Sequence, residues 1–174
     1  MKTTDAVLAS NREYAQSFSY GHLPMPPSRR LAVLACMDAR LTIEPMLGLK
    51  TGEAHIIRNA GGHATEDALR SLVISLHLLG TEEIMIINHS DCGMLTFKDE
   101  ELKQKLSQKT GKEAEYPQHF HAFSNLARHV REQVQRIKSH PWIPANVPVR
   151  GFIYDVKTGK LEEVSVEAAQ PAAL

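Results

Sequence analysis

The sequence of 174 residues contains little cysteine, few aromatic residues and no excess of charge of either sign. Two cysteines are too few for a disulfide framework, so we expect a reducing, cytoplasmic location. Lys+Arg and Asp+Glu number 20 each, which provides no basic surplus for nucleic acid or an anionic membrane. No apolar run approaches the roughly 18 residues of a membrane span, and the N-terminus lacks the apolar core of a signal peptide. We therefore expect neither a nucleic-acid nor a membrane partner.

The order of the apolar segments predicts one α/β domain over residues 1–174. Residues 31–36 are apolar throughout, which is typical of a parallel strand covered by helices on both faces. Further strands are expected at 54–57, 83–88, 149–154 and 160–164, and helices at 65–80, 99–109 and 117–139. This order predicts a mostly parallel sheet of about four strands, with an antiparallel edge strand at 160–164, flanked by helices.

Both ends of the chain are expected to lie outside this core. Residues 4–18 are predicted to form an amphipathic helix and the proline-rich stretch 21–28 a connector, so residues 1–28 together are expected to be an arm. Such an arm often packs on a second subunit. Residues 167–174 are expected to be a disordered tail.

Three potential metal ligands follow two of the apolar strands. Cys36 ends the strand at 31–36, His89 ends the strand at 83–88, and Cys92 follows three residues later. In α/β sheets, sites form beyond the carboxyl ends of parallel strands, so these side chains converge if the two strands are neighbours. Two thiolates and an imidazole suit one zinc ion per chain, and three protein ligands leave a fourth position open, as in catalytic sites.

An acid–base pair follows the first ligand. Two thiolates nearly cancel the zinc charge, so this centre should acidify water less than a three-histidine site does. Asp38 is placed to accept a hydrogen bond from the nucleophile, and Arg40 is placed to keep Asp38 ionised. Without Arg40, Asp38 could move onto the zinc and close the site, so open and Asp38-closed states both remain alternatives. Asp91 is expected to support the loop between two ligands.

These motifs together resemble the β-class carbonic anhydrases. The resemblance rests on Cys36-Met-Asp-Ala-Arg40, Arg58-Asn-Ala-Gly-Gly62 and His89-Ser-Asp-Cys-Gly93, in this order and spacing. It covers residues 30–97 strongly and assigns the ligand role to Cys36, His89 and Cys92 and the dyad role to Asp38 and Arg40. It also implies dimers or dimers of dimers, in which the N-terminal helix embraces a neighbour. Met94 stands where many members have a second glycine. This departure, together with Asp91 and the sequence Met94-Leu-Thr-Phe97, resembles a compact bacterial and fungal branch that also includes carbonyl sulfide hydrolases.

The resulting hypothesis is attack of zinc-bound hydroxide on a small linear carbonyl substrate. Reversible hydration of CO2 to bicarbonate is preferred, and hydrolysis of carbonyl sulfide to CO2 and hydrogen sulfide is the alternative. Ala60 and Gly61 are candidates for lining the substrate pocket, since glycine permits close approach. His63 is a candidate proton shuttle because it follows the glycine pair near the predicted site.

Two interpretations from other classes remain open. One is a structural zinc site, which would need a fourth protein ligand such as Asp38. The other is an anion-binding module that uses residues 58–62 in front of the helix at 65, although this stretch matches no phosphate-loop pattern. The remaining histidines are expected to be surface or capping residues: His22, His55, His77, His119, His121, His129 and His140.

Overall fold

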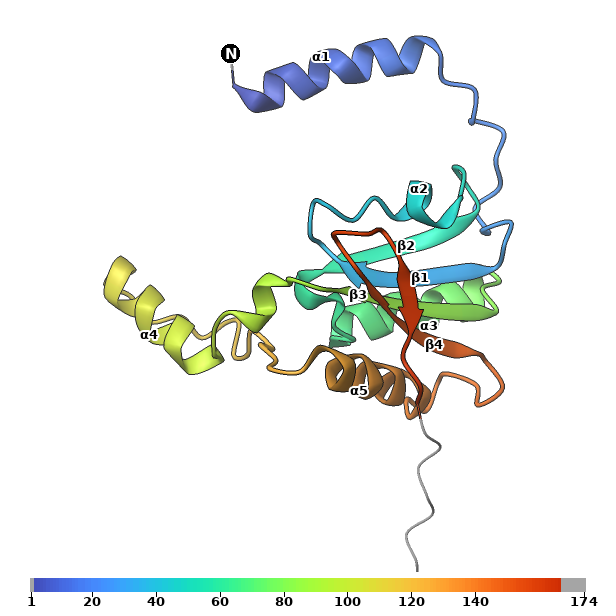
Figure 1. The fold of residues 1–174 in the computed structure, drawn as a ribbon. Coiled ribbons are helices and arrows are strands. Elements are labelled where there is room, and N and C mark those ends of the chain that lie inside the picture. The colour runs from blue at the N-terminus through green and yellow to red at the C-terminus, as the bar shows by residue number, and fades with distance from the viewer. Residues whose placement is uncertain (1, 167–174) are drawn as a thin grey trace, which may run out of the picture.

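The core of the protein is a five-stranded sheet in a computed structural model that describes residues 2–166 (Figure 1). The strands lie in the order β2-β1-β3-β4-β5, with the first four parallel and β5 antiparallel to β4. Their bounds are Leu31–Cys36 (β1), Ala54–Asn59 (β2), Glu83–His89 (β3), Val149–Tyr154 (β4) and Leu161–Glu163 (β5). The predicted α/β class and the antiparallel edge strand are therefore confirmed. The expected disordered tail, 167–174, lies outside the described residues.

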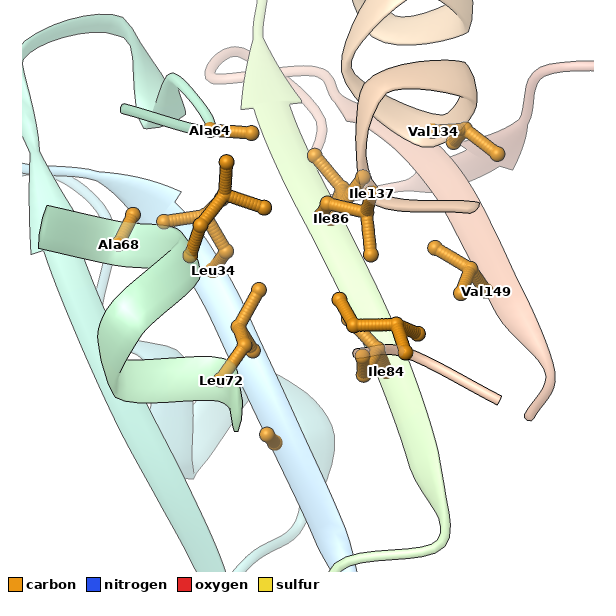
Figure 2. Close-up of a cluster of buried hydrophobic side chains, with 12 residues drawn as sticks. Leu34, Ala64, Ala68, Leu72, Ile84, Ile86, Val134, Ile137 and Val149 are labelled. Atoms are coloured by element: carbon orange, nitrogen blue, oxygen red, sulfur yellow. The ribbon is translucent and has the colours of Figure 1, made fainter. Parts of the chain in front are cut away.

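One apolar layer lies between the sheet and two helices, α3 (Glu66–Leu78) and α5 (Leu126–Lys138). Figure 2 shows Leu34 of β1, Ile86 of β3 and Leu72 of α3 pointing into this layer. Successive side chains of a strand point to opposite faces, so alternate residues of β1 and β3 supply it. The layer fixes where α3 and α5 lie relative to the central strands.

A second apolar layer covers the opposite face of the sheet. It contains Val33 of β1, Ile87 of β3 and Ile43 of the short helix α2 (Ile43–Leu47). The same cluster includes the buried side chains of Cys36 and Cys92. Both cysteines are thus part of the packed core, which holds their sulfurs in place.

Helix α3 begins as the sequence predicts. The side chain of Thr65 accepts a hydrogen bond from the backbone N–H of Ala68, and Glu66 and Asp67 occupy the first turn. Both features stabilise a helix N-terminus. The predicted helix at 65–80 is confirmed, with its end at Leu78.

The prediction of one helix over 117–139 is wrong in its first half, because α5 begins only at Leu126. The side chain of Asn125 caps that start by accepting from the N–H of Arg128 at 2.9 Å. Upstream, the carboxylate of Asp99 accepts from three successive backbone N–H groups at 2.8 to 3.1 Å, those of Phe120, His121 and Ala122. An anchored loop therefore replaces the helix at 117–125, although its phenylalanines continue the helical spacing.

Two helices extend away from the sheet (Figure 1). These are α1 (Thr3–Gln16) and α4 (Asp99–Thr110), and neither contains a buried residue in the described chain. The first and the segment after it expose apolar side chains by half or more, namely Val7, Leu8, Tyr14 and Phe18. The predicted arm is therefore present, and it carries apolar surface that the body of the same chain does not cover.

Gly151 of β4 provides a test of how tightly α5 packs. A Cβ at this position would lie 2.9 Å from Cγ2 of Val134 and closer still to Cγ1 of Val130, and both valines are fully buried. We expect Gly151→Ala to lower the free energy of unfolding by about 1 to 3 kcal/mol, because overpacking forces α5 away from the sheet. Denaturant titration measures this change. Gly21→Ala is the control, since its Cβ meets only a Phe18 ring carbon at 3.8 Å; equal unfolding midpoints for the two variants would contradict the argument.

Candidate metal centre

Two neighbouring parallel strands bring the first two candidate ligands to one edge of the sheet. Ala35 of β1 pairs with Ile87 of β3, so Cys36 and His89 leave the strands at nearly the same level. The turn after β3 returns Cys92 to the same place. One ligand atom from each of Cys36, His89 and Cys92 lies within 4.8 Å of the other two, and all three side chains are buried. The convergence expected from the sequence is therefore present in the structure.

The imidazole of His89 is oriented for metal binding. Its Nδ1 lies 2.9 Å from the carbonyl oxygen of Ser90, so Nδ1 carries the proton and donates it. Its Nε2 is buried and has no hydrogen-bond partner in the described part of the chain. An unsatisfied buried polar atom costs about 1 to 3 kcal/mol, and a carbonyl behind Nδ1 is the usual support of a metal-binding histidine. The donor set thus fits a cation placed between Nε2 and the two sulfurs.

Each cysteine side chain shifts the pKa of the other. Hydrogen bonding between the two side chains is the main cause that lowers the pKa of Cys36 and raises the pKa of Cys92. The lowered pKa favours the thiolate form of Cys36. A thiolate is the form that binds metal, and a divalent cation would displace the remaining proton.

Asp38 lies beside the three ligands, held by Arg40. Its Oδ1 accepts from the backbone N–H and from Nε of Arg40, both at 2.9 Å, and its Oδ2 accepts from Nη2 at 2.8 Å. The side-chain bonds from Arg40 hold the pKa of Asp38 well below its usual range. Oδ2 lies 3.7 Å from Nε2 of His89. The carboxylate is therefore ionised and next to the ligand group, but it does not belong to that group.

Arg40 has a second acidic partner that the sequence analysis did not recognise. Its Nη1 donates to Oδ2 of Asp91 at 2.8 Å, and its Nη2 donates to the backbone carbonyl of Asp91 at 2.9 Å. The guanidinium thus bridges two carboxylates that lie beside different ligands. The only sequence signal was the position of Asp91 between His89 and Cys92.

Arg58, although exposed, donates hydrogen bonds to two backbone carbonyls of its own chain. Its Nε donates to the carbonyl of Cys36 at 3.0 Å, and its Nη2 donates to the carbonyl of Asp38 at 2.6 Å. These bonds fix the backbone that carries a ligand and a dyad residue. They also use two of the five N–H donors of the guanidinium on which the anion-binding interpretation of residues 58–62 depended.

A glycine turn packs against the first ligand. The turn is the 3-10 segment η1 (Ala60–Gly62), and a Cβ at Gly62, where φ is 56°, would lie 3.0 Å from the backbone nitrogen of Cys36. A Cβ at Gly61 would lie 3.1 Å from the side chain of Met94 and 3.3 Å from that of Phe123. Close approach therefore requires glycine here. Of the two predicted pocket residues, Ala60 is exposed and Gly61 is buried, and their contact with substrate stays a prediction.

His63 lies in a stack of rings rather than alone. Its ring centroid is 4.2 Å from that of His121 and 5.3 Å from that of His129. Burial lowers its pKa to about 3, so this imidazole is neutral near neutral pH. A proton shuttle works best with a pKa near the operating pH, which argues against the shuttle role that the sequence suggested.

The expectation that His129 is a surface or capping residue is wrong. Its side chain is 3% exposed, and its Nε2 lies 3.2 Å from the carbonyl oxygen of Gly61. His55 is also partly buried, and its Nδ1 lies 2.7 Å from Oγ of Ser75. The amphipathic spacing of α5 indicated which side of the helix is buried, but not which backbone carbonyl a polar residue on that side would meet.

Similarity to known proteins agrees with this geometry. The chain is 47% identical over 165 residues to Beta-carbonic anhydrase 1 of Mycobacterium tuberculosis, covering 95% of this chain and 99% of the relative. Residues 31–161 match the family model described as carbonic anhydrase. The chain belongs to the β-carbonic anhydrase family. The resemblance inferred from the motifs is thereby confirmed, and the family is one of enzymes.

Two further relatives are similar to this chain over most of its length. A crystal structure of carbonic anhydrase from Streptococcus mutans superposes with a TM-score of 0.89 at 42% identity, covering 95% of this chain and 99% of that one. Carbon disulfide hydrolase of Acidithiobacillus thiooxidans is 36% identical over 155 residues, covering 79% of this chain and 78% of the relative. The β-carbonic anhydrase fold thus extends to proteins named for a sulfur substrate. Among residues 2–166, no helix has both the length and the hydropathy that crossing a bilayer requires.

The two carboxylates that contact Arg40 should differ in their effect. The side chain of Asp38 is 19% exposed and that of Asp91 is 73% exposed, and an exposed ion pair contributes only about 0 to 1 kcal/mol. We expect Asp91→Ala to reduce turnover only a few-fold, because Arg40 keeps its bonds to Asp38, whereas Asp38→Ala should reduce turnover by about 100-fold or more. Steady-state kinetics, with metal content measured on each sample, compare the two variants. Equal losses would contradict this ranking.

Proposed function

We propose that this protein is a zinc-dependent carbonic anhydrase that reversibly hydrates CO2 to bicarbonate. One zinc ion per chain would be held by Cys36, His89 and Cys92. The observation that supports this most is the group of three buried ligand atoms within 4.8 Å of one another, because sulfur and nitrogen in this number are the ligands of a catalytic zinc site. In the described residues no fourth His, Cys, Asp or Glu joins the group, which favours a catalytic over a structural site.

Two residues outside the ligand group would handle the nucleophile. A bound zinc ion supplies the positive charge that makes water a nucleophile near neutral pH and that stabilises negative charge on the substrate. Asp38 would accept a hydrogen bond from the attacking water and fix its direction, since its Oδ2 already lies 3.7 Å from Nε2 of His89. Arg40 would hold Asp38 ionised and away from the metal through its two side-chain bonds.

The proposed cysteine ligands also indicate that the protein works in a reducing compartment. Cys36 and Cys92 are free and buried, and a metal site of this kind works only while both sulfurs stay reduced. A reducing compartment such as the cytoplasm meets that requirement.

Hydrolysis of a sulfur analogue is the second candidate activity. The carbon disulfide hydrolase relative, which is 36% identical, supports this activity. Carbonyl sulfide has one oxygen, as CO2 does, and one sulfur, as carbon disulfide does. Sulfur is larger than oxygen, so the choice depends on the width of the pocket. A Cβ at Gly61 would lie 3.1 Å from Met94 and 3.3 Å from Phe123, so little free space surrounds this predicted pocket residue, which favours the smaller CO2.

A paired assay decides between the two activities. The purified protein is tested on CO2, carbonyl sulfide and carbon disulfide, with zinc measured in the same sample. We expect one zinc per chain and CO2 hydration as the dominant activity. Cys36→Ser should lose both zinc and activity, because a thiolate ligand is missing, whereas Arg40→Ala should retain zinc and lose most turnover. Dominant release of hydrogen sulfide, with negligible CO2 hydration, would reverse the ranking of the two substrates.

We also propose that the protein acts as a dimer or a dimer of dimers. Helix α1 exposes Val7, Leu8 and Tyr14 and buries none of its residues against its own chain. A short helix without tertiary packing is marginal in water, so a neighbouring subunit is the natural partner for this apolar side. The arm would then stabilise the assembly and be stabilised by it.

Charge on the arm should disrupt this assembly. We expect the double variant Val7→Lys, Tyr14→Lys to shift the protein to a smaller mass in sedimentation velocity, because lysine cannot be buried unpaired at an interface. Arg12→Lys, which lies on the same helix and keeps its charge, is the control and should sediment like the wild type. An unchanged mass in the double variant would remove α1 from the interface.

A further inference from the structure

Two buried polar side chains contact the carbonyl oxygen of Gly61. It accepts a hydrogen bond from Nδ2 of Asn88, and Nε2 of His129 lies 3.2 Å from it. Asn88 is 0% and His129 3% exposed, and they come from β3 and α5. Neither residue belongs to the proposed ligands or to the dyad, so the roles described above do not account for these bonds.

The backbone N–H of Ala64 determines which atoms donate and which accept in the hydrogen bonds of the α5 side chains. The N–H of Ala64 donates to Oε1 of Gln133 at 2.9 Å, which identifies Oε1 as the amide oxygen. Nε2 of Gln133 therefore donates to Nδ1 of His129 at 3.3 Å. With Nδ1 an acceptor, the neutral ring must carry its proton on Nε2, which points at the carbonyl of Gly61. Ala64, Gln133, His129 and Gly61 thus form one polar chain in which each hydrogen bond has a single allowed direction.

The ring of His129 is also fixed in its plane. Its centroid lies 3.9 Å from that of Phe123 with the planes 9° apart, and the His63 ring lies 5.3 Å away with the planes 28° apart. Burial lowers the pKa of His129, so the ring stays neutral and keeps its one Nε2 proton. The donor that faces Gly61 is therefore held in position and in protonation state.

The other side of the same turn touches the metal centre. Gly62 approaches so closely that a Cβ would lie 3.0 Å from the nitrogen of Cys36 and 3.1 Å from the carbonyl carbon of Ala35. The backbone N–H of Met37, the residue after Cys36, donates to the carbonyl of Asn59, directly before the turn, at 2.9 Å. The turn therefore supports the backbone of a proposed ligand, and such support determines how a ligand is oriented toward its metal.

We propose that Gln133 and His129 are positioning residues of the metal centre, which hold the turn at Gly61 and Gly62 against Cys36 and thereby fix the position of its sulfur at the metal. The inference rests on the proposed binding of metal by Cys36, His89 and Cys92. The chain from α5 therefore supports the first ligand from behind, as the partners of ligands do in metal sites.

The first test needs no substitution. Nitrogen-15 NMR of the imidazoles in the wild-type protein reports which ring nitrogen carries the proton. We expect His129 to be the neutral tautomer with its proton on Nε2, both without metal and with zinc. A proton on Nδ1 would break the chain at Gln133 and overturn the inference.

The second test uses cobalt in place of zinc. In His129→Leu, we expect the thiolate-to-cobalt charge-transfer band to shift, because the turn no longer holds Cys36 in place, and the amide resonance of Gly61 to shift with the turn. Metal affinity should change by about 10-fold, as is typical when a hydrogen bond behind a ligand is lost. His129→Gln should restore the wild-type band, since its side-chain amide can donate to the Gly61 carbonyl.

His55→Leu is the matched control. His55 is a partly buried histidine bonded to Ser75 between β2 and α3, so its loss removes a similar polar contact without touching Gly61. It should leave the cobalt band and the Gly61 amide unchanged. The inference fails if His129→Leu binds cobalt with an unchanged band, or if His55→Leu shifts the band equally.

A second variant guards against a His129 substitution that does not fold. Gln133→Glu keeps the shape of the side chain and an acceptor for Ala64, but a carboxylate cannot donate to Nδ1 of His129. We expect the His129 proton to move to Nδ1 and the cobalt band to shift as in His129→Leu; a retained Nε2 proton would overturn the inference. Failure of the proposed function looks different, because the wild-type protein would then bind no cobalt, whereas failure of this inference leaves normal loading.

Discussion

The parallel pairing of β1 with β3 is the constraint on which the rest of the structure depends. Cys36 ends one strand and His89 ends the other, and the pairing brings both to one edge of the sheet. A slip of one residue would displace the strands by about 3.3 Å and turn every side chain to the opposite face. The three ligand atoms, now within 4.8 Å, would then separate. The register of two central strands is therefore as important to the chemistry as the identity of the ligands.

This constraint couples stability to function. Cys36 and Cys92 belong to the same buried apolar layer as Val33 and Ile87, so the packing that holds the sheet together also fixes the sulfurs. The turn behind Cys36 allows no side chain at Gly62, where a Cβ would collide with the backbone of β1. An apolar core of this kind cannot relax around a misplaced ligand without opening a cavity or overpacking. The geometry of the proposed site is thus set by the fold, before any metal is considered.

The sequence predicted this part of the protein well, because its signals are local. Apolar runs marked the strands, and the ligands stood directly at their ends. The polar chain from α5 was missed, since the bonded atoms of His129 and Gly61 belong to residues 68 positions apart and nothing near either residue indicates the contact. The wrong prediction of a helix at 117–125 has the same cause, a contact between residues that are far apart in the sequence. Its amides bond to Asp99, which lies 21 to 23 positions upstream, and this long-range cap overrides the local apolar spacing.

The two sets of polar groups around the ligands also differ in environment. Asp38 and Arg40 have side chains 19% and 46% exposed, so solvent reaches the carboxylate that Arg40 holds in place. His129 and Gln133 are each 3% exposed, where hydrogen bonds act in a low dielectric and are costly to leave unmade. The exposed pair therefore suits the step that changes during turnover. The buried chain suits a property that must stay constant, which is the position of the Cys36 sulfur. A metal centre needs both, because its ligands must stay in place while the groups beside them react.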